Sequence, residues 1–249
     1  MALFDRYTKI DIVEKNYNCQ SGQVWKLGKQ FLIYDIIKSK MFKACITSPP
    51  YNANTKELYN NSFNDNKKDY NDWLLKVISI IDRLVKGYFN LNISYTSNSI
   101  DNYIDIVYYT KAETDFNLID TAIWNKNRGY YGNSKKYLFR RFEFIFIFNN
   151  DIHKEYKKIS TNVLNIFNHS QVIKGFNASF PMELPKFFLE LETDKNDLIL
   201  ETFAGTGTVL IASQQLNRIS YNIEINPNFA NMILNRFYNE FAIEPILIN

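Results

Sequence analysis

The last third of the sequence alternates short apolar runs with segments of helical period. Residues 197–202 (DLILET) and 219–225 (ISYNIEI) have the composition of buried strands. Helices are predicted at residues 209–216 and 228–239, and residues 203–208 (FAGTGT) make a glycine turn before the first helix. A strand, turn, helix and strand in this order predict an α/β fold with a mostly parallel, doubly wound sheet.

The middle of the chain supplies more elements of the same kind. An apolar run at residues 42–47 predicts a buried strand that ends at a double proline, because proline donates no ladder hydrogen bond. Residues 70–86 place apolar side chains three and four positions apart, which predicts an amphipathic helix closed by Gly87. Further strands are predicted at residues 88–95, 118–124 and 142–148.

Length and composition limit the class of protein. With 249 residues, 46% of them hydrophobic and 22% charged, the chain can bury one substantial core, so a single domain over residues 1–249 is expected. A net charge of +3 does not by itself indicate a nucleic-acid partner. Cys19 and Cys45 are too few for a disulfide framework or a zinc site, which favours a reducing cytoplasm and no metal. No apolar stretch approaches 18 residues, so no membrane contact is expected.

The glycine turn is the first candidate binding site. Gly205 and Gly207 let the backbone approach a ligand closely at the carboxyl end of a strand. The third glycine of a dinucleotide fingerprint is replaced by Leu210, and a tight strand-to-helix turn explains the motif equally well. Glu224, at the end of the next strand, is placed to bind ribose hydroxyls. A nucleoside cofactor without a pyrophosphate would suit this site, although a single Glu at a strand end is more commonly a solvated acid.

The stretch ITSPPYN is the second candidate site. The double proline fixes the backbone at a strand end and leaves rigid carbonyl groups that point into the adjacent crevice. Ser48 adds a hydroxyl and Tyr51 a ring face, so the set is suited to a planar group with an amino substituent. A strand that is simply ended by proline is the alternative interpretation.

Two segments, residues 126–141 and 150–176, are basic, aromatic and polar. Either they are solvated connections, as most charged runs are, or they bind nucleic acid through cations interleaved with aromatic rings. The candidate DNA contacts are Arg128, Tyr130, Lys135, Lys136, Arg140 and Arg141.

These motifs together resemble those of the β group of amino-directed DNA methyltransferases, which use S-adenosylmethionine. TSPPY resembles the catalytic motif of that family, FAGTGT its cofactor motif, and Phe180-Pro181 the segment before the cofactor strand. The segments IWNK (residues 123–126) and RRFEFIFIF (residues 140–148) are also similar, and the catalytic motif precedes the cofactor motif as in the β group. The resemblance implies a circularly permuted, Rossmann-like methyltransferase fold with a small target-recognition insertion.

The resemblance also implies roles for individual residues. The implied catalytic residues are Ser48, Pro49, Pro50 and Tyr51. The implied cofactor-binding residues are Phe180, Pro181, Glu201, Thr202, Phe203, Ala204, Gly205, Thr206, Gly207, Thr208 and Glu224. The substrate would be double-stranded DNA, with one base flipped out of the helix and methylated on its exocyclic amino group. A homodimer and a cognate restriction endonuclease are the protein partners that such a relationship suggests.

Two departures and three alternatives accompany the resemblance. Glu201-Thr202 stands where the family usually has Asp-Pro, and Gly28-Lys29 where it often has Gly-Asp, which leaves one expected adenosine contact in doubt. Ser48 favours cytosine N4 as the methylated atom, and adenine N6 is the alternative. A DNA-binding protein that keeps the fold without the chemistry is a second alternative. A nicotinamide-dependent oxidoreductase is disfavoured by Leu210.

Overall fold

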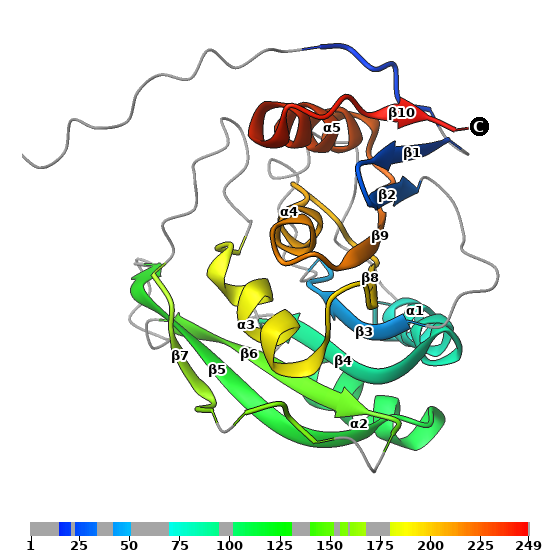
Figure 1. The fold of residues 1–249 in the computed structure, drawn as a ribbon. Coiled ribbons are helices and arrows are strands. Elements are labelled where there is room, and N and C mark those ends of the chain that lie inside the picture. The colour runs from blue at the N-terminus through cyan, green and yellow to red at the C-terminus, as the bar shows by residue number, and fades with distance from the viewer. Residues whose placement is uncertain are drawn as a thin grey trace, which may run out of the picture.

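A computed structural model describes residues 15–20, 23–33, 42–50, 70–94, 102–130, 140–151, 155–158, 160–167 and 180–248. In this described part, ten strands form one sheet in the order β10-β1-β2-β9-β8-β3-β4-β6-β5-β7 (Figure 1). The strands are β1 (Val24–Leu27), β2 (Gln30–Ile33), β3 (Phe42–Thr47), β4 (Val85–Ile93), β5 (Asn117–Tyr130), β6 (Arg140–Asn149), β7 (Val163–Asn165), β8 (Leu198–Glu201), β9 (Ile219–Ile223) and β10 (Ile246–Leu247). The helices are α1 (Tyr70–Leu84), α2 (Asn102–Glu113), α3 (Glu183–Glu192), α4 (Thr208–Gln215) and α5 (Pro227–Phe241).

The centre of the sheet is parallel. β2 pairs with β9, β9 with β8, β8 with β3, and β3 with β4, each in parallel. β6 then runs antiparallel between β4 and β5. The carboxyl ends of β3, β4, β8 and β9 therefore lie along one edge of the sheet, where open α/β folds bind their ligands.

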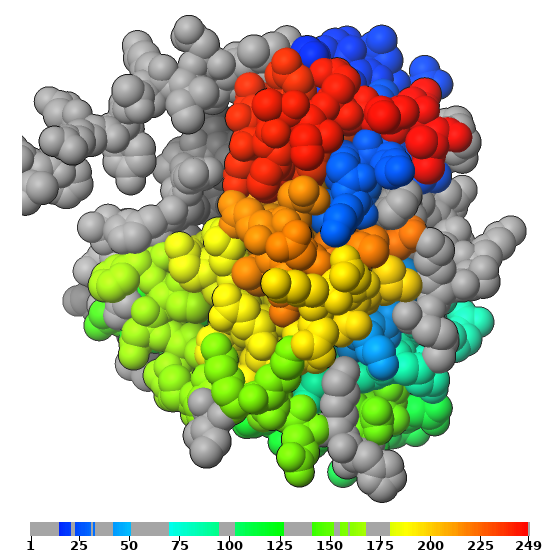
Figure 2. Space-filling model, viewed as in Figure 1, coloured from blue at the N-terminus to red at the C-terminus, as the bar shows by residue number. Residues whose placement is uncertain are grey.

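Helices cover both faces of the sheet, as the predicted doubly wound fold requires. α1 and α2 pack into a core on one face, around Phe42, Phe89 and Phe148. α3 and α4 pack on the opposite face, and α4 and α5 form a third cluster with β1 and β2. In Figure 2 the atoms of α3, α4 and α5 cover the viewed face above β5 and β6.

The predicted elements are present, but the first helix ends earlier than expected. α1 stops at Leu84, and Val85 already pairs with Phe42 of β3. Gly87, predicted as the residue that closes the helix, lies inside β4 at φ 143° and donates its N–H to Asn150 Oδ1 at 3.0 Å. The prediction for Gly87 was wrong because strand pairing with β3 starts immediately after the helix.

The segment after Trp124 is more regular than a solvated connection. β5 continues to Tyr130 and β6 begins at Arg140, so both ends of residues 126–141 belong to a hairpin. Residues 163–165 of the second basic segment form β7, which pairs with β5. None of the described helices is long and apolar enough to cross a membrane.

Candidate functional site

The two candidate motifs meet at the carboxyl edge of the sheet. β3 leads into Ser48 and the double proline, and its neighbour β8 leads into the glycine turn. The strands pair through Ala44 with Ile199 and Cys45 with Leu200. This register brings together two motifs that are far apart in the sequence.

A direct side-chain contact joins the two strand ends. The Thr47 hydroxyl donates to Glu201 Oε1 at 2.5 Å and lies 3.1 Å from Thr202 Oγ1. The same carboxylate oxygen accepts the backbone N–H of Phe203 at 2.9 Å. Thr47 and Glu201 are both 2% exposed, and burial raises the pKa of the Glu201 carboxyl to about 8. The contact of Thr47 with Glu201 was not predicted, because it joins residues 154 positions apart.

The two glycines of the turn have different roles. Both have left-handed backbone angles, φ 53° at Gly205 and φ 77° at Gly207. A Cβ at Gly207 would meet Ile233 of α5 at 3.0 Å, so this glycine is required by packing. A Cβ at Gly205 would have only the carbonyl oxygen of Phe203 nearby, at 3.8 Å. The open space at Gly205 is a feature that a bound ligand can use.

Glu224 is buried and is oriented by the backbone. Its Oε2 accepts the N–H of Gly205 at 2.7 Å, and its Oε1 accepts the N–H of Asn226 at 2.8 Å. Glu224 is 7% exposed and burial raises its pKa to about 7, so the alternative of a solvated acid was wrong. Each carboxylate oxygen has a further lone pair, which leaves capacity to accept hydroxyl groups of a ligand.

The double proline is fixed by α1. Ser48 is half-buried, Pro49 is buried, and the carbonyl of Pro50 accepts the Tyr70 hydroxyl at 2.6 Å. The Pro50 carbonyl is thus engaged within the protein, which corrects for Pro50 the expectation that the carbonyls of this pair face the crevice. Tyr51 lies outside the described residues.

An aromatic chain links α1 to the glycine turn. The ring centroids of Tyr70 and Trp73 are 5.8 Å apart, and those of Trp73 and Phe203 are 5.6 Å apart. From the other side of the turn, Arg236 of α5 donates to the Thr206 carbonyl at 2.9 Å and lies 3.3 Å from Thr208 Oγ1. Thus α1 and α5 both fix the position of the turn, and neither contact was predicted.

Phe180 and Pro181 lie at the start of α3. Pro181 is buried and its carbonyl accepts the Leu184 N–H at 3.1 Å, while Phe180 packs against the core below α3. The next residue, Met182, packs against the cluster that contains Ala204 of the glycine turn. The segment predicted to precede the cofactor strand therefore packs against the same cluster as the glycine turn.

The departure at Gly28-Lys29 lies away from this site. These residues form the turn between β1 and β2, at the amino end of β2. Lys29 donates to Asn196, which precedes β8, at 3.3 Å. The Gly28-Lys29 pair therefore lies at the amino end of β2, opposite the two motifs, where it is not placed to contact a ligand at this site.

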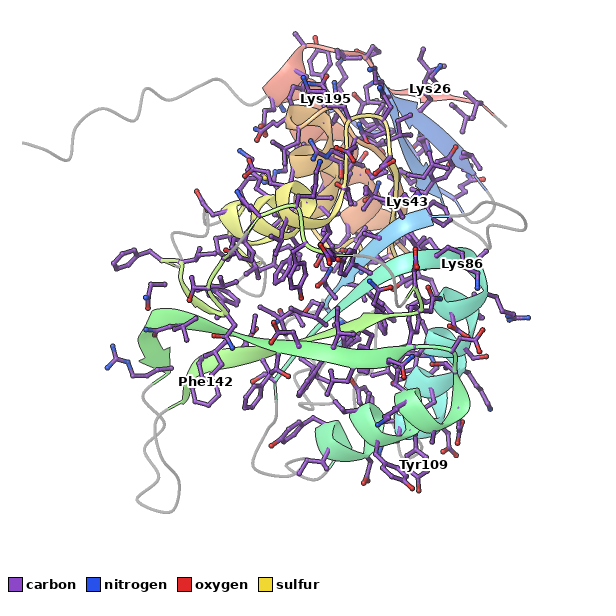
Figure 3. All side chains as sticks on the ribbon, turned by 60° about the horizontal axis from the view of Figure 1, so that its bottom comes forward. Lys26, Lys43, Lys86, Tyr109, Phe142 and Lys195 are labelled. Atoms are coloured by element: carbon purple, nitrogen blue, oxygen red, sulfur yellow. The ribbon has the colours of Figure 1, made fainter. Side chains whose placement is uncertain are left out.

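The β5–β6 hairpin extends beyond the carboxyl end of β4. The last pair of β4 with β6 is Ile93 with Phe144, whereas β5 and β6 remain paired to Asn125–Phe142 and again at Tyr130–Arg140. Arg141 and Phe142 are exposed on this extension, and Figure 3 shows Phe142 at the end of the hairpin, away from Lys43 and Lys86.

The other candidate DNA contacts can be placed only in part. Arg128, Tyr130 and Arg140 lie in the hairpin strands, but their side chains are outside the described residues, as are Lys135 and Lys136 entirely. No three His, Cys, Asp or Glu side chains in the described part of the chain are grouped to hold a metal ion.

Comparison with known proteins places the same residues within one family. The family model described as DNA methylase (N6_N4_Mtase) matches residues 42–235. The Type II beta methyltransferase M.BslI of Bacillus sp. (strain NEB-606) is 27% identical over 94% of this chain, which spans 30% of the length of that relative. The solved PvuII DNA methyltransferase, described as cytosine-N4-specific, is 19% identical with a TM-score of 0.62, over 80% of this chain and 79% of that one. The M1.HpyAVI–SAM complex is 21% identical with a TM-score of 0.60, over 79% and 89% of the two chains.

Proposed function

Because the chain belongs to the DNA methylase family whose model spans residues 42–235, we propose that it transfers a methyl group from S-adenosylmethionine to the exocyclic amino group of a base in double-stranded DNA. The observation that carries this proposal is the contact between the two motifs at one edge of the sheet, through Thr47 and Glu201. A base held at the double proline and a cofactor held at the glycine turn would be neighbours there.

The residues of the turn suit such a cofactor. Glu224 is held by two backbone N–H groups and can accept ribose hydroxyls with its remaining lone pairs, and Gly205 leaves space beside it. The half-buried ring of Phe203 begins the same turn. The bound cofactor supplies a methyl group on a sulfonium, which is an electrophile. A solved relative in the same fold, M1.HpyAVI, is described as a complex with SAM, which supports this choice of cofactor.

The chain would contribute positioning and electrostatics at the amino group. Ser48 and the Pro49 carbonyl would accept its two N–H bonds, which directs the nitrogen lone pair towards the methyl group. Transfer would form a nitrogen–carbon bond as the carbon–sulfur bond breaks, and the proton lost from the nitrogen would pass to solvent. Tyr51 would stack on the base, which must leave the duplex to reach this edge.

Ser48 favours cytosine N4 as the acceptor, because the resemblance associates serine at this position mainly with cytosine-N4 enzymes. Adenine N6, for which aspartate is the usual residue, is the second candidate. The third is a protein that binds DNA without transferring a methyl group, which would still use the exposed hairpin residues.

The β5–β6 hairpin and β7 support a role in target recognition for residues 126–141 and 150–176. Arg141 and Phe142 are exposed on the hairpin, beyond the edge that carries the two motifs. Cations there would neutralise phosphates, and exposed rings would pack against bases or sugars. A homodimer and a cognate restriction endonuclease remain the proposed protein partners.

Mass spectrometry of nucleosides tests the proposal. DNA incubated with the protein and S-adenosylmethionine should contain N4-methylcytosine, and Ser48→Ala should abolish most of it while calorimetry shows cofactor binding largely intact. N6-methyladenine alone would reverse the choice of base. Cofactor binding without any methylated nucleoside, on DNA of varied sequence, would favour the DNA-binding alternative.

A further inference from the structure

We propose that Glu201 is a positioning residue that ties the base-binding segment to the cofactor turn, and that Thr47 transmits its position to Ser48 and Pro49. The proposal rests on the proposed function and adds a residue pair to the same site. Neither side chain would touch base or cofactor, so the role proposed for Glu201 differs from the direct cofactor contact that the resemblance implies. Both would act through their neighbours.

The link between the base-binding segment and the cofactor turn depends on a single oxygen atom. Glu201 Oε1 accepts from the Thr47 hydroxyl at 2.5 Å and from the Phe203 N–H at 2.9 Å. Thr47 directly precedes Ser48, and Phe203 is the first residue of the glycine turn. A movement of this oxygen therefore shifts the residue before the proposed catalytic serine together with the first residue of the turn.

The contact lies where the two strands end. Ala44 and Cys45 are the β3 residues paired with β8, and the side chains of Thr47 and Glu201 join the strand ends beyond those pairs. Both residues are 2% exposed, so water cannot readily replace a lost partner. A buried group that loses its hydrogen bond is costly, which makes the geometry of this pair well determined.

A second contact fixes the other side of the same segment. The Tyr70 hydroxyl holds the Pro50 carbonyl at 2.6 Å, so Ser48 and Pro49 lie between two anchored residues. Thr47 is connected to Phe203 by the two hydrogen bonds that Glu201 Oε1 accepts. Pro50 is connected to Phe203 through its hydrogen bond with Tyr70 and the ring contacts of Trp73. Both anchors converge on the residue that opens the turn.

This arrangement predicts which kinetic quantity changes. Reactions that depend on positioning lose about 100-fold in rate for a displacement of roughly 1 Å. Removing the Thr47 hydroxyl leaves the turn bonded to Glu201, so cofactor affinity should change little while kcat falls. If Thr47 had only a structural role, replacing it would lower the stability of the fold without a selective loss of kcat.

The test compares Thr47→Val, which keeps the shape without the hydroxyl, with Thr47→Ser, which keeps the hydroxyl. Glu192→Gln is the matched control, since Glu192 is also 2% exposed and accepts from the Asn90 side chain at 2.6 Å, between α3 and β4. We expect Thr47→Val to lower kcat by about tenfold or more at saturating DNA and cofactor, with the dissociation constant for S-adenosylmethionine within about threefold of wild type. Thr47→Ser should restore most of kcat, and Glu192→Gln should lower the melting temperature without lowering kcat.

Hydrogen–deuterium exchange provides a readout that does not need turnover. Cofactor binding should slow exchange in the peptide covering residues 42–52 in wild type and Thr47→Ser, and should slow it much less in Thr47→Val. A kcat for Thr47→Val within twofold of wild type, equal losses in Thr47→Ser, or equal cofactor protection in all variants would overturn the proposal. If the wild-type chain binds cofactor but transfers no methyl group, only the proposed function is overturned. The exchange comparison still decides whether Glu201 links the two segments. A chain that does not bind cofactor overturns both.

Discussion

Tyr70, the first residue of α1, donates its phenolic hydroxyl to the backbone carbonyl of Pro50 at 2.6 Å. Tyr70 is itself 4% exposed and packs in the core that α1 and α2 form on one face of the sheet. The double proline restricts its own backbone angles, and this hydrogen bond fixes the direction in which the chain leaves β3.

Replacing Tyr70 with Phe removes this hydroxyl and keeps the ring in the core. We expect the free energy of unfolding to fall by about 1 kcal/mol, as for one intramolecular hydrogen bond. The kcat for methyl transfer should fall by more than the loss of stability alone would cause, because the position of Pro49 depends on Pro50. Chemical denaturation and kcat measure the two effects. Tyr108→Phe, at an exposed position of α2, is the control and should change neither.

The two glycines of the turn should respond differently to alanine. Gly207→Ala brings a Cβ to 3.0 Å from Ile233 and requires the alanine to adopt the left-handed backbone angle of φ 77°. The substitution should therefore destabilise the fold by about 1–3 kcal/mol. Gly205→Ala has only the backbone penalty, about 1 kcal/mol, since its Cβ meets no atom within 3.4 Å. Its methyl group would instead fill the space proposed for the cofactor.

Melting curves and calorimetry with S-adenosylmethionine distinguish these two effects. The Gly207 variant should show the larger drop in melting temperature, and the Gly205 variant the larger loss of affinity relative to its loss of stability. If the ratio of affinity loss to stability loss were the same in both variants, separate roles for the two glycines would be contradicted.

The order of elements around the site was predictable from the sequence, whereas its internal contacts were not. Short apolar runs and the glycine turn indicate β3, β8, β9, α4 and α5, because each has a strong local period or a turn residue. α3 was missed since Pro185 lies in its first turn, a position that proline tolerates but that interrupts the pattern. α2 mixes exposed tyrosines with isoleucines and has no clear apolar face in the sequence.

Contacts such as Thr47–Glu201 and Arg236–Thr206 arise only when neighbouring strands and helices are assembled. A pattern within one segment cannot reveal them, because each partner is an ordinary residue in its own segment. The resemblance placed Glu201 among the cofactor-binding residues and marked it as a departure from Asp-Pro, without indicating a contact with Thr47. Its burial against β3 shows that the longer side chain reaches Thr47.

The buried acids predict how stability depends on pH. Burial raises the pKa of Glu201 from 4.5 to about 8 and that of Glu224 from 4.5 to about 7. The folded chain therefore binds more protons than the unfolded chain between pH 4.5 and about 8. Their contribution to stability is fully present below pH 4.5 and is lost as the pH rises through the two folded values.

Glu201→Gln tests this dependence, because glutamine keeps an oxygen acceptor and does not ionise. Above pH 5 the free energy of unfolding of the variant should fall less steeply with pH than that of wild type, by about 1 kcal/mol per pH unit. Denaturant titrations at pH 5, 6, 7 and 8 measure the difference. Parallel curves for the two proteins would show that Glu201 is ionised at neutral pH in the folded chain.

The hairpin should determine the salt dependence of DNA binding. Arg141 is exposed on the part of β6 that extends past β4 and directly precedes Phe142. Lys86 is exposed near the start of β4, and Figure 3 shows it far from Phe142. Arg141→Glu should weaken DNA binding and reduce the slope of log affinity against log salt by about 1 or more, since a phosphate contact releases a counterion. Lys86→Glu changes the net charge equally and should leave that slope nearly unchanged. Fluorescence anisotropy with a labelled duplex at several salt concentrations measures both slopes, and calorimetry should show unaltered cofactor affinity in both variants. Equal slopes for the two variants would mean that net charge, rather than the hairpin, governs the interaction with DNA.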